Sequence, residues 1–252
     1  MDFVFDLDGT LCFDRMTIAE DIKETLYSAP SFGHEVTFAS ARSYRDCIDL
    51  LGNELMRNRV IGLNGGLAYQ DAQLIFHRHL TKTSYELALT WCHHHGLPYF
   101  VDDDFNYAHF RGQKIPFISS VDPLGLASRL DIAELHNPIK TVIYMGDHEN
   151  LIEPFMAELN ALQEMDVDYH AHEKCLYLNP FETNKATTII DCLGHNFVAF
   201  GNDKNDIAMF QASAHAVQVG DFALLRPFAD EMTSAAHVSQ KIQDVFERFS
   251  HV

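Results

Sequence analysis

The sequence predicts an α/β protein whose core is a doubly wound parallel sheet, interrupted by an inserted α+β domain. Segments typical of strands and helices alternate from the N-terminus to about residue 66, and they alternate again from about residue 184 onward. Between these stretches, short strand-like segments follow one another with only two helical ones, which is typical of an α+β module. We therefore assign residues 1–78 and 179–252 to the core and residues 79–178 to the inserted domain.

The first strand leads directly into two acidic residues. Phe3, Val4 and Phe5 form a short apolar run, and Asp6-Leu7-Asp8-Gly9-Thr10 follows it at once. In open α/β sheets ligands bind outside the carboxyl ends of the strands, so these acids lie where chemistry is usually done. Two carboxylates this close repel unless a cation or a shared proton lies between them. The pattern therefore indicates a metal site.

The other strands of the first stretch also end in polar residues. Ser40 and Arg42 follow the second strand, and Asn64 and Gly65 follow the third. The first predicted helix begins with a Thr-x-x-Glu capping box. In chain order the predicted elements are a helix from Thr17 to about Pro30, a strand over residues 35–39, a helix from Ser43, and a strand over residues 59–63.

The inserted and final stretches are predicted in the same way. His93, His94 and His95 form a tract in the first inserted helix, but adjacent helical residues point in different directions and cannot converge on one ion. Strands are predicted near residues 98–101, 107–110, 140–145, 168–170 and 174–178, and helices near residues 85–91 and 153–162. The final stretch predicts helices over residues 184–193 and 238–249, and strands over residues 196–200 and 216–219.

The polar residues at the predicted strand ends supply the parts of a phosphoryl-transfer site. They are a carboxylate pair, a hydroxyl in Ser40, a cation in Lys185, and an acidic and amide cluster in the loop from Gly201 to Asp206. Oxygen ligands of this kind suit Mg²⁺, which binds through one or two carboxylates plus substrate phosphate. A carboxylate can also accept the phosphoryl group covalently. On this argument alone, either Asp6 or Asp8 could be the nucleophile.

In their order along the chain, these groups resemble the four motifs of the haloacid dehalogenase superfamily of phosphatases. Asp6-Leu7-Asp8-Gly9-Thr10 resembles the first motif, Ser40-Ala41-Arg42 the second, Asn184-Lys185-Ala186 the third, and the stretch from Gly201 to Met209 the fourth. An insertion between the second and third motifs resembles the Cof-type branch, whose lid is called a C2B cap. The resemblance implies a Rossmann-like core with the inserted domain as that cap.

The resemblance also implies a role for each residue. Asp6 would be the nucleophile and a metal ligand, and Asp8 the general acid/base that also contacts Mg²⁺ through its backbone carbonyl; Ser40 and Lys185 would bind the transferring phosphoryl group. The fourth motif usually starts Gly-Asp, whereas this chain has Gly201-Asn202, so either Asn202 or Asp203 is expected to complete the metal site with Asp206. The predicted substrate-binding residues are Arg42, Asn64, Gly65 and Asn205. Arg42 has an alternative reading as a structural ion-pair partner, and Asn64 as a turn residue.

Composition limits the partners. Thirty-six acidic residues against 18 basic ones give a formal charge of −18, which argues against a nucleic-acid or anionic-membrane surface. The five cysteines are widely spaced with no Cys-x-x-Cys pair, and the N-terminus does not resemble a leader, so a cytoplasmic protein is expected, as a monomer or homodimer.

The expected activity is Mg²⁺-dependent hydrolysis of a small phosphorylated metabolite through an aspartyl-phosphate, with a sugar phosphate as the leading substrate class by resemblance. A phosphomutase would use the same acids and pass the phosphoryl group to a second hydroxyl. A catalytically weak metabolite-binding protein is a further alternative if Asn202 weakens metal binding. A phosphoacceptor signalling domain is about half this length, which argues against it.

Overall fold

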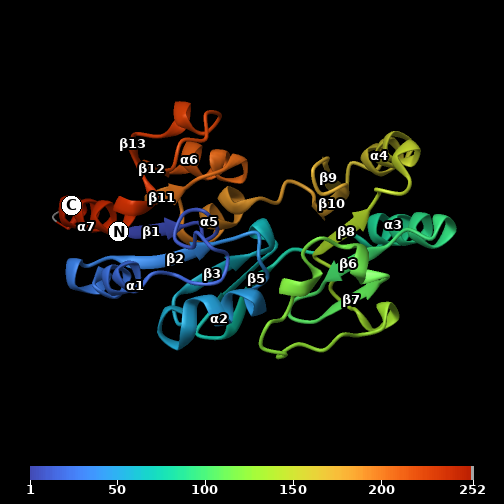
Figure 1. Cartoon of the computed structure of the whole chain (residues 1–252), viewed down its shortest axis with the longest axis horizontal. Helices are drawn as coiled ribbons and strands as arrows, with labels where there is room; N and C mark the ends of the chain where they lie inside the picture. The colour runs from blue at the N-terminus through green and yellow to red at the C-terminus, as the bar shows by residue number, and fades with distance from the viewer. Residues whose placement is uncertain (251–252) are drawn as a thin grey trace. The chain divides into compact units, whose positions relative to one another are not determined.

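The computed structural model describes residues 1–250, and the chain divides into two compact units (Figure 1). The core unit combines Met1–Ile75 with the segment from Asn184 to the C-terminal end, and the inserted unit is Phe76–Thr183. The insertion thus begins three residues earlier and ends five residues later than the range 79–178 assigned from sequence. Among the described residues, every helix is too short or too polar to span a bilayer.

The core unit contains an eight-stranded sheet in the order β13-β12-β11-β1-β2-β3-β4-β5. Neighbouring strands from β13 to β3 are parallel, and β4 runs antiparallel to β3. The predicted doubly wound parallel sheet is therefore confirmed. Its strands are β1 (Asp2–Phe5), β2 (Glu35–Ala39), β3 (Arg59–Gly62), β4 (Leu67–Gln70), β5 (Gln73–His77), β11 (Phe197–Gly201), β12 (His215–Val219) and β13 (Glu231–Thr233).

Helices connect these strands, and α1 packs with α7 while α5 packs with α6. The core unit's helices are α1 (Glu20–Tyr27), α2 (Tyr44–Leu55), α5 (Lys185–Leu193), α6 (Ile207–Ala212) and α7 (Val238–Phe249). The predicted capping box at Thr17 is wrong: α1 begins after Ala19, which makes no side-chain cap. Asp14 accepts hydrogen bonds from the Thr17 backbone N–H and hydroxyl at 2.7 and 2.8 Å, so the Thr17 hydroxyl is engaged in the preceding loop.

Aromatic packing buries β1 between its neighbours and α7. Phe5 stacks on Phe200 of β11 at 4.9 Å between ring centroids, and Phe3 meets Phe246 of α7 edge-on at 4.7 Å. All four side chains are buried. Because β1 lies between β2 and β11, the residue that follows it, Asp6, emerges at the middle of the sheet.

The inserted unit contains a second sheet, in the order β7-β6-β8-β10-β9, in which every pair is antiparallel. Its strands are β6 (Tyr99–Asp102), β7 (Tyr107–Phe110), β8 (Lys140–Tyr144), β9 (Met165–His170) and β10 (Cys175–Pro180), and its helices are α3 (Lys82–His95) and α4 (Ile152–Ala161). The α+β character predicted for this stretch is what the structure shows.

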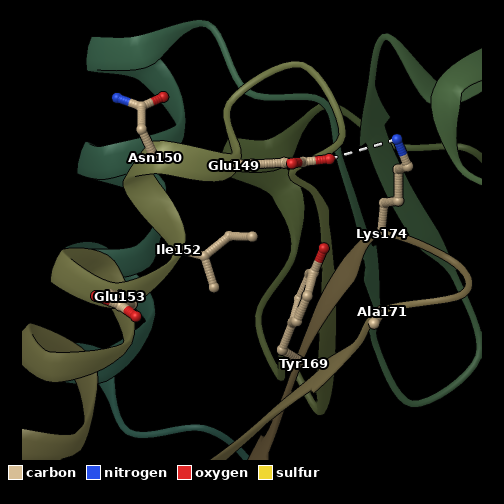
Figure 2. A pocket seen from close by; sticks show the side chains of 7 residues that line it. All are labelled: Glu149, Asn150, Ile152, Glu153, Tyr169, Ala171 and Lys174. Atoms are coloured by element: carbon tan, nitrogen blue, oxygen red, sulfur yellow. Dashed lines mark hydrogen bonds and ion pairs between the residues drawn. The ribbon is translucent and has the colours of Figure 1, made fainter.

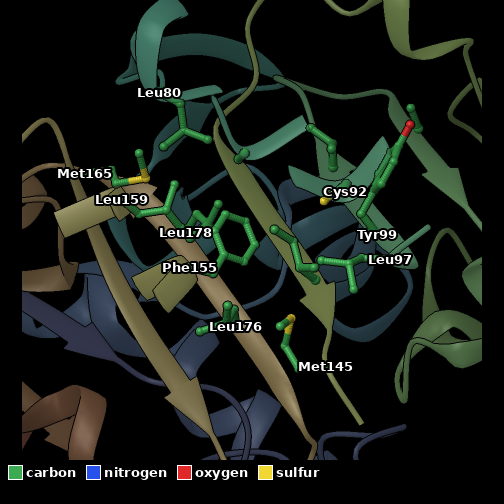
Figure 3. Close-up of a cluster of buried hydrophobic side chains, with 14 of the residues drawn as sticks. Leu80, Cys92, Leu97, Tyr99, Met145, Phe155, Leu159, Met165, Leu176 and Leu178 are labelled. Atoms are coloured by element: carbon green, nitrogen blue, oxygen red, sulfur yellow. The ribbon is translucent and has the colours of Figure 1, made fainter. Parts of the chain in front are cut away.

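Both helices of the inserted unit contribute to one apolar cluster (Figure 3). Cys92 of α3 and Phe155 of α4 pack there with alternate residues of the strands, such as Tyr99 and Leu176. The intervening strand residues, including Phe100, belong to a separate small cluster. This alternation is the period-2 pattern of a sheet buried on both faces.

Candidate active site

A buried lysine joins two buried carboxylates at the carboxyl end of the core sheet. Asp6 follows β1 directly, and Lys185 is the first residue of α5, which Asn184 caps by accepting a hydrogen bond from the Thr187 backbone N–H. Lys185 Nζ donates to Asp6 Oδ1 at 2.5 Å and to Asp206 Oδ1 at 2.7 Å. The three side chains are at most 5 % exposed. Residues separated by 179 positions in sequence thus form one charged cluster.

Burial and charge act against each other in this cluster. Burial raises the pKa of Asp6 above its ordinary value, the positive charge of Lys185 opposes that rise, and Asp206 adds to it. Burial lowers the pKa of Lys185, but the carboxylates of Asp206 and Asp6 more than offset this, so its pKa lies above the ordinary value. Lys185 is therefore a permanent cation at neutral pH, held beside Asp6.

Asp8 is held by Arg42 in a two-bond ion pair. Arg42 donates from Nε to Asp8 Oδ2 at 2.8 Å and from Nη2 to Asp8 Oδ1 at 2.6 Å. The same Nη2 also donates to the carbonyl of Arg15 at 2.7 Å. Fork-to-fork geometry of this kind fixes both position and plane of a carboxylate. The structure therefore brings Arg42 to Asp8, in agreement with its reading as an ion-pair partner.

The side chain of Asn202 lies among oxygens that fit a divalent cation. One atom of its amide lies 3.0 Å from Asp6 Oδ2, 3.0 Å from the Asp8 carbonyl and 3.1 Å from Thr10 Oγ1. In one amide orientation a nitrogen at this position donates hydrogen bonds to all three oxygens. In the other, an oxygen there accepts from the Thr10 hydroxyl and lies beside two further oxygens that a cation could join. Adjacent oxygens of an octahedron with Mg–O distances of about 2.1 Å lie about 3.0 Å apart. The donor set and its spacing therefore fit Mg²⁺.

Asp206 and Asp203 stabilise the loop that carries Asn202. Asp206 Oδ2 accepts hydrogen bonds from the backbone N–H groups of Asn202 and Asp203 at 2.9 and 3.1 Å, while its other oxygen faces Lys185. Asp203 is exposed and accepts from the Lys204 backbone N–H at 2.6 Å. The side chain brought beside Asp6 is thus that of Asn202, and Asp203 serves as the cap of a short 3-10 helix, η7 (Lys204–Asp206).

The remaining predicted residues line the adjoining loops. Ser40 is buried after β2, and its Oγ accepts from the Arg42 backbone N–H at 3.1 Å. Asn64 lies in a left-handed conformation, with φ of 56°, and its Oδ1 accepts from Asn205 Nδ2 at 3.3 Å. Gly65 has φ of 105°, and a Cβ there would lie 2.3 Å from the carbonyl of Asn184. Only glycine fits this approach to the cap of α5.

Sequence reasoning assigned no role to Thr10 or Thr188. Thr10 Oγ1 donates to Asp6 Oδ2 at 3.0 Å, which orients the carboxylate that Lys185 holds by its other oxygen. Thr188 Oγ1 donates to the carbonyl of Gly65 at 2.6 Å and ties that loop to α5. The position of Thr10 directly after Asp8-Gly9 could have indicated its role. Nothing in the sequence indicates the role of Thr188, because its partner is 123 positions away.

Each unit has a cavity of its own. A cavity of about 420 Å³ in the core unit borders the site and is lined by Gly9, Phe13, Asn202, Asp203 and Phe222, among others. A cavity of about 500 Å³ lies on the inserted unit. Figure 2 shows its lining, in which Lys174 pairs with Glu149 at 3.4 Å while Tyr169 and Ile152 lie across from each other. Sequence patterns predicted neither cavity.

Comparison with known proteins places the chain among hydrolases. Residues 3–235 match the sequence model of the haloacid dehalogenase-like hydrolases. A haloacid dehalogenase-like hydrolase from Bacteroides thetaiotaomicron is 21% identical, with a TM-score of 0.80 over 97% of this chain and 98% of that one. A protein from Thermotoga maritima is 18% identical, with a TM-score of 0.81 over 98% and 97%. A sugar phosphatase described as subclass IIB is 18% identical, with a TM-score of 0.75 over 100% and 99%. No curated protein sequence matches the chain. At sequence identities of 18–21%, the likeness to the solved structures establishes the fold.

Proposed function

This chain belongs to the haloacid dehalogenase-like hydrolases, and on that premise we propose that it is a Mg²⁺-dependent phosphatase of a small phosphorylated metabolite. The observation that carries the proposal is the buried cluster in which Lys185 holds Asp6 and Asp206. A nucleophilic carboxylate must meet an anionic phosphate, and a fixed cation beside it reduces their repulsion. A sugar phosphate is the proposed substrate class, supported by the described activity of the subclass IIB relative.

We assign the metal to oxygens of Asp6, the Asp8 carbonyl and Asn202. When bound, Mg²⁺ would neutralise developing charge on the transferring phosphoryl group. Asp206 was expected to be a direct ligand, but its oxygens face Lys185 and the backbone of its own loop, and the oxygens close to the Asn202 amide belong to Asp6, Asp8 and Thr10. We therefore propose that Asp206 positions Lys185 and the Asn202 loop.

The proposed reaction has two displacements at phosphorus. A carboxylate oxygen of Asp6 attacks, the bond to the leaving oxygen breaks, and Asp8 gives that oxygen a proton; Asp8 then takes a proton from the water that hydrolyses the aspartyl-phosphate. Lys185, and the hydroxyl of Ser40, bind the transferring group. Arg42 takes one lone pair of each Asp8 oxygen, so the proton that Asp8 gives and takes is carried on a remaining lone pair.

The test is hydrolysis of an aryl phosphate and of a panel of sugar phosphates with Mg²⁺, measured as released phosphate. Asp6→Asn should abolish turnover, and Asp8→Asn should accumulate a phosphorylated protein that mass spectrometry detects. Asp49→Asn, an exposed acid on α2, is the matched control and should keep full activity. Full activity of Asp6→Asn would refute the nucleophile. Transfer of phosphate to a second sugar hydroxyl would instead identify a phosphomutase. If the protein binds Mg²⁺ but turns over none of the substrates, it would be identified as a binding protein.

A further inference from the structure

The chain enters the inserted unit through a His-x-His sequence in extended backbone. His77 ends β5 and His79 follows two residues later, so both side chains lie on the same side of the segment. The residues between and before them point the other way: Arg78 lies over the ring of Phe76 at 5.6 Å and donates to Thr183 Oγ1 at 3.5 Å. The two imidazoles are thus presented together.

Asp104, in the turn after β6, completes a cluster with these histidines. His77 Nδ1 lies 3.0 Å from Asp104 Oδ1 and 2.9 Å from His79 Nε2, and His79 Nε2 lies 3.5 Å from Asp104 Oδ1. Ligand atoms on a tetrahedral zinc ion, at distances of about 2.0–2.2 Å from the metal, are separated by about 3.3 Å. The three observed separations bracket that value. From this geometry we propose that His77, His79 and Asp104 bind a zinc-type divalent ion, a second metal site distinct from the one at Asp6.

Hydrogen bonding alone accounts poorly for this arrangement. If His77 Nδ1 carries a lone pair, it accepts from His79 but faces a carboxylate oxygen with no hydrogen between them. If it carries a hydrogen, that one hydrogen is shared between two acceptors at 2.9 and 3.0 Å. A cation at the centre attracts the lone pairs of all three atoms, so one ligand satisfies every contact.

The carboxylate is held in place by its surroundings, as metal ligands usually are. Asn137 Nδ2 donates to Asp104 Oδ2 at 2.8 Å, which leaves Oδ1 directed at the histidines. The Asp104 backbone N–H donates to Asp103 Oδ1 at 2.7 Å, and Asp103 Oδ2 accepts from the His136 backbone N–H at 3.2 Å. Protein hydrogen bonds therefore fix the turn that carries Asp104.

The ligand types select the metal class. Imidazole nitrogens favour Zn²⁺ and its neighbours over Mg²⁺, which prefers oxygen alone. Three protein ligands leave a fourth tetrahedral position, and the 42 % exposure of the His77 side chain makes that position accessible to water or to an anion.

Metal titration of the full chain tests the proposal. The protein is freed of tag and metal and kept in excess Mg²⁺ to occupy oxygen-rich sites; Zn²⁺ binding is then measured by calorimetry, and Co²⁺ binding by its visible spectrum. One equivalent of Zn²⁺ and a tetrahedral Co²⁺ spectrum are expected. His77→Gln and His79→Gln should each abolish both signals, and Asn137→Ala should weaken Zn²⁺ binding about 10- to 100-fold.

His94→Gln is the matched control, because His94 is exposed on α3 in a tract of three histidines and should leave binding unchanged. Fluorescence of Trp91, which stacks on Phe155 in the inserted unit, verifies that each variant is folded. The proposal fails if the folded wild-type protein binds no Zn²⁺, if His77→Gln and His79→Gln retain it, or if binding disappears with His94. Hydrolytic activity plays no part in these readouts, so failure here leaves the proposed phosphatase untouched.

Discussion

Replacement of Lys185 by methionine tests the charge balance at the centre of the core unit. Methionine keeps most of the volume of the side chain but removes the cation that lies 2.5 and 2.7 Å from two carboxylates. Asp6 and Asp206 are then left buried and facing each other without compensation. Removal of one partner from a buried ion pair costs about 3–5 kcal/mol of unfolding free energy, which corresponds to roughly 6–20 °C in melting temperature.

The loss of unfolding free energy in Lys185→Met should increase as the pH rises. Burial raises the pKa of Asp6 and the positive charge of Lys185 opposes that rise, so without Lys185 the folded-state pKa of Asp6 lies further above its unfolded value. Groups with raised folded pKa values are protonated more readily when folded, so they favour folding at low pH and oppose it as pH rises. The deficit of Lys185→Met against wild type should therefore be largest near pH 8 and shrink toward pH 5.

Two probes separate the units in this experiment. Amide hydrogen exchange of β1 and β11, measured without metal, reports the unit that contains Lys185, and fluorescence of Trp91 reports the inserted unit, which should not change. Lys185→Met with Asp206→Asn should recover part of the loss, because one buried charge is removed with the other. Lys23→Met, in a surface pair with Glu20, should stay within about 0.5 kcal/mol. A loss below about 1 kcal/mol that does not vary with pH would refute the reasoning.

Two further predictions concern the core unit. Glu231 accepts from Arg248, and also from Lys241 at 3.1 Å, and these bonds lower its pKa to about 2; the stability it contributes should be complete above pH 5 and decline as pH falls toward 2. The gap in unfolding free energy between wild type and Glu231→Gln should narrow over that range in urea titrations, and a constant gap would contradict the assignment. Gly65→Ala should cost roughly 1–3 kcal/mol more than Gly33→Ala, because both glycines have positive φ but a Cβ at Gly33 meets nothing within 4 Å. Equal losses in thermal unfolding would show that the approach to Asn184 is not limiting.

Local patterns predicted the sheet because buried parallel strands read as short apolar runs that end in polar residues. Asp6 and Lys185 could be selected because the order of motifs places both at the carboxyl edge. The partner of Asp8 was left open, because nothing in the sequence states that the fork of Arg42 reaches a carboxylate 34 positions away. The choice between Asn202 and Asp203 depends on loop dihedrals, which adjacent residues do not reveal.

The histidines also show that sequence spacing alone does not reveal which side chains meet. The conspicuous run at His93–His95 drew attention in the sequence, although helical geometry separates its side chains. The pair at His77 and His79 went unremarked, because the meaning of a two-residue spacing depends on whether the backbone is extended. The third ligand, Asp104, lies 27 positions from His77, and only folding identifies it.

The boundary between the units has a consequence for how such a protein can be altered. Thr183 is the last residue of the inserted unit, Asn184 caps α5, and Lys185 follows at once, so the return crossing is one residue from the central cation. The outgoing crossing, between Ile75 and Phe76, lies within the edge strand β5, which contributes no residue to the charged cluster. If the inserted unit is exchanged for another, the sequence at the first junction should therefore be free to vary. The sequence at the second junction, next to Lys185, should have to be kept. In a chimaera, the two junctions would tolerate sequence changes unequally, and the sequence at the second junction would decide whether the core unit keeps its active-site geometry.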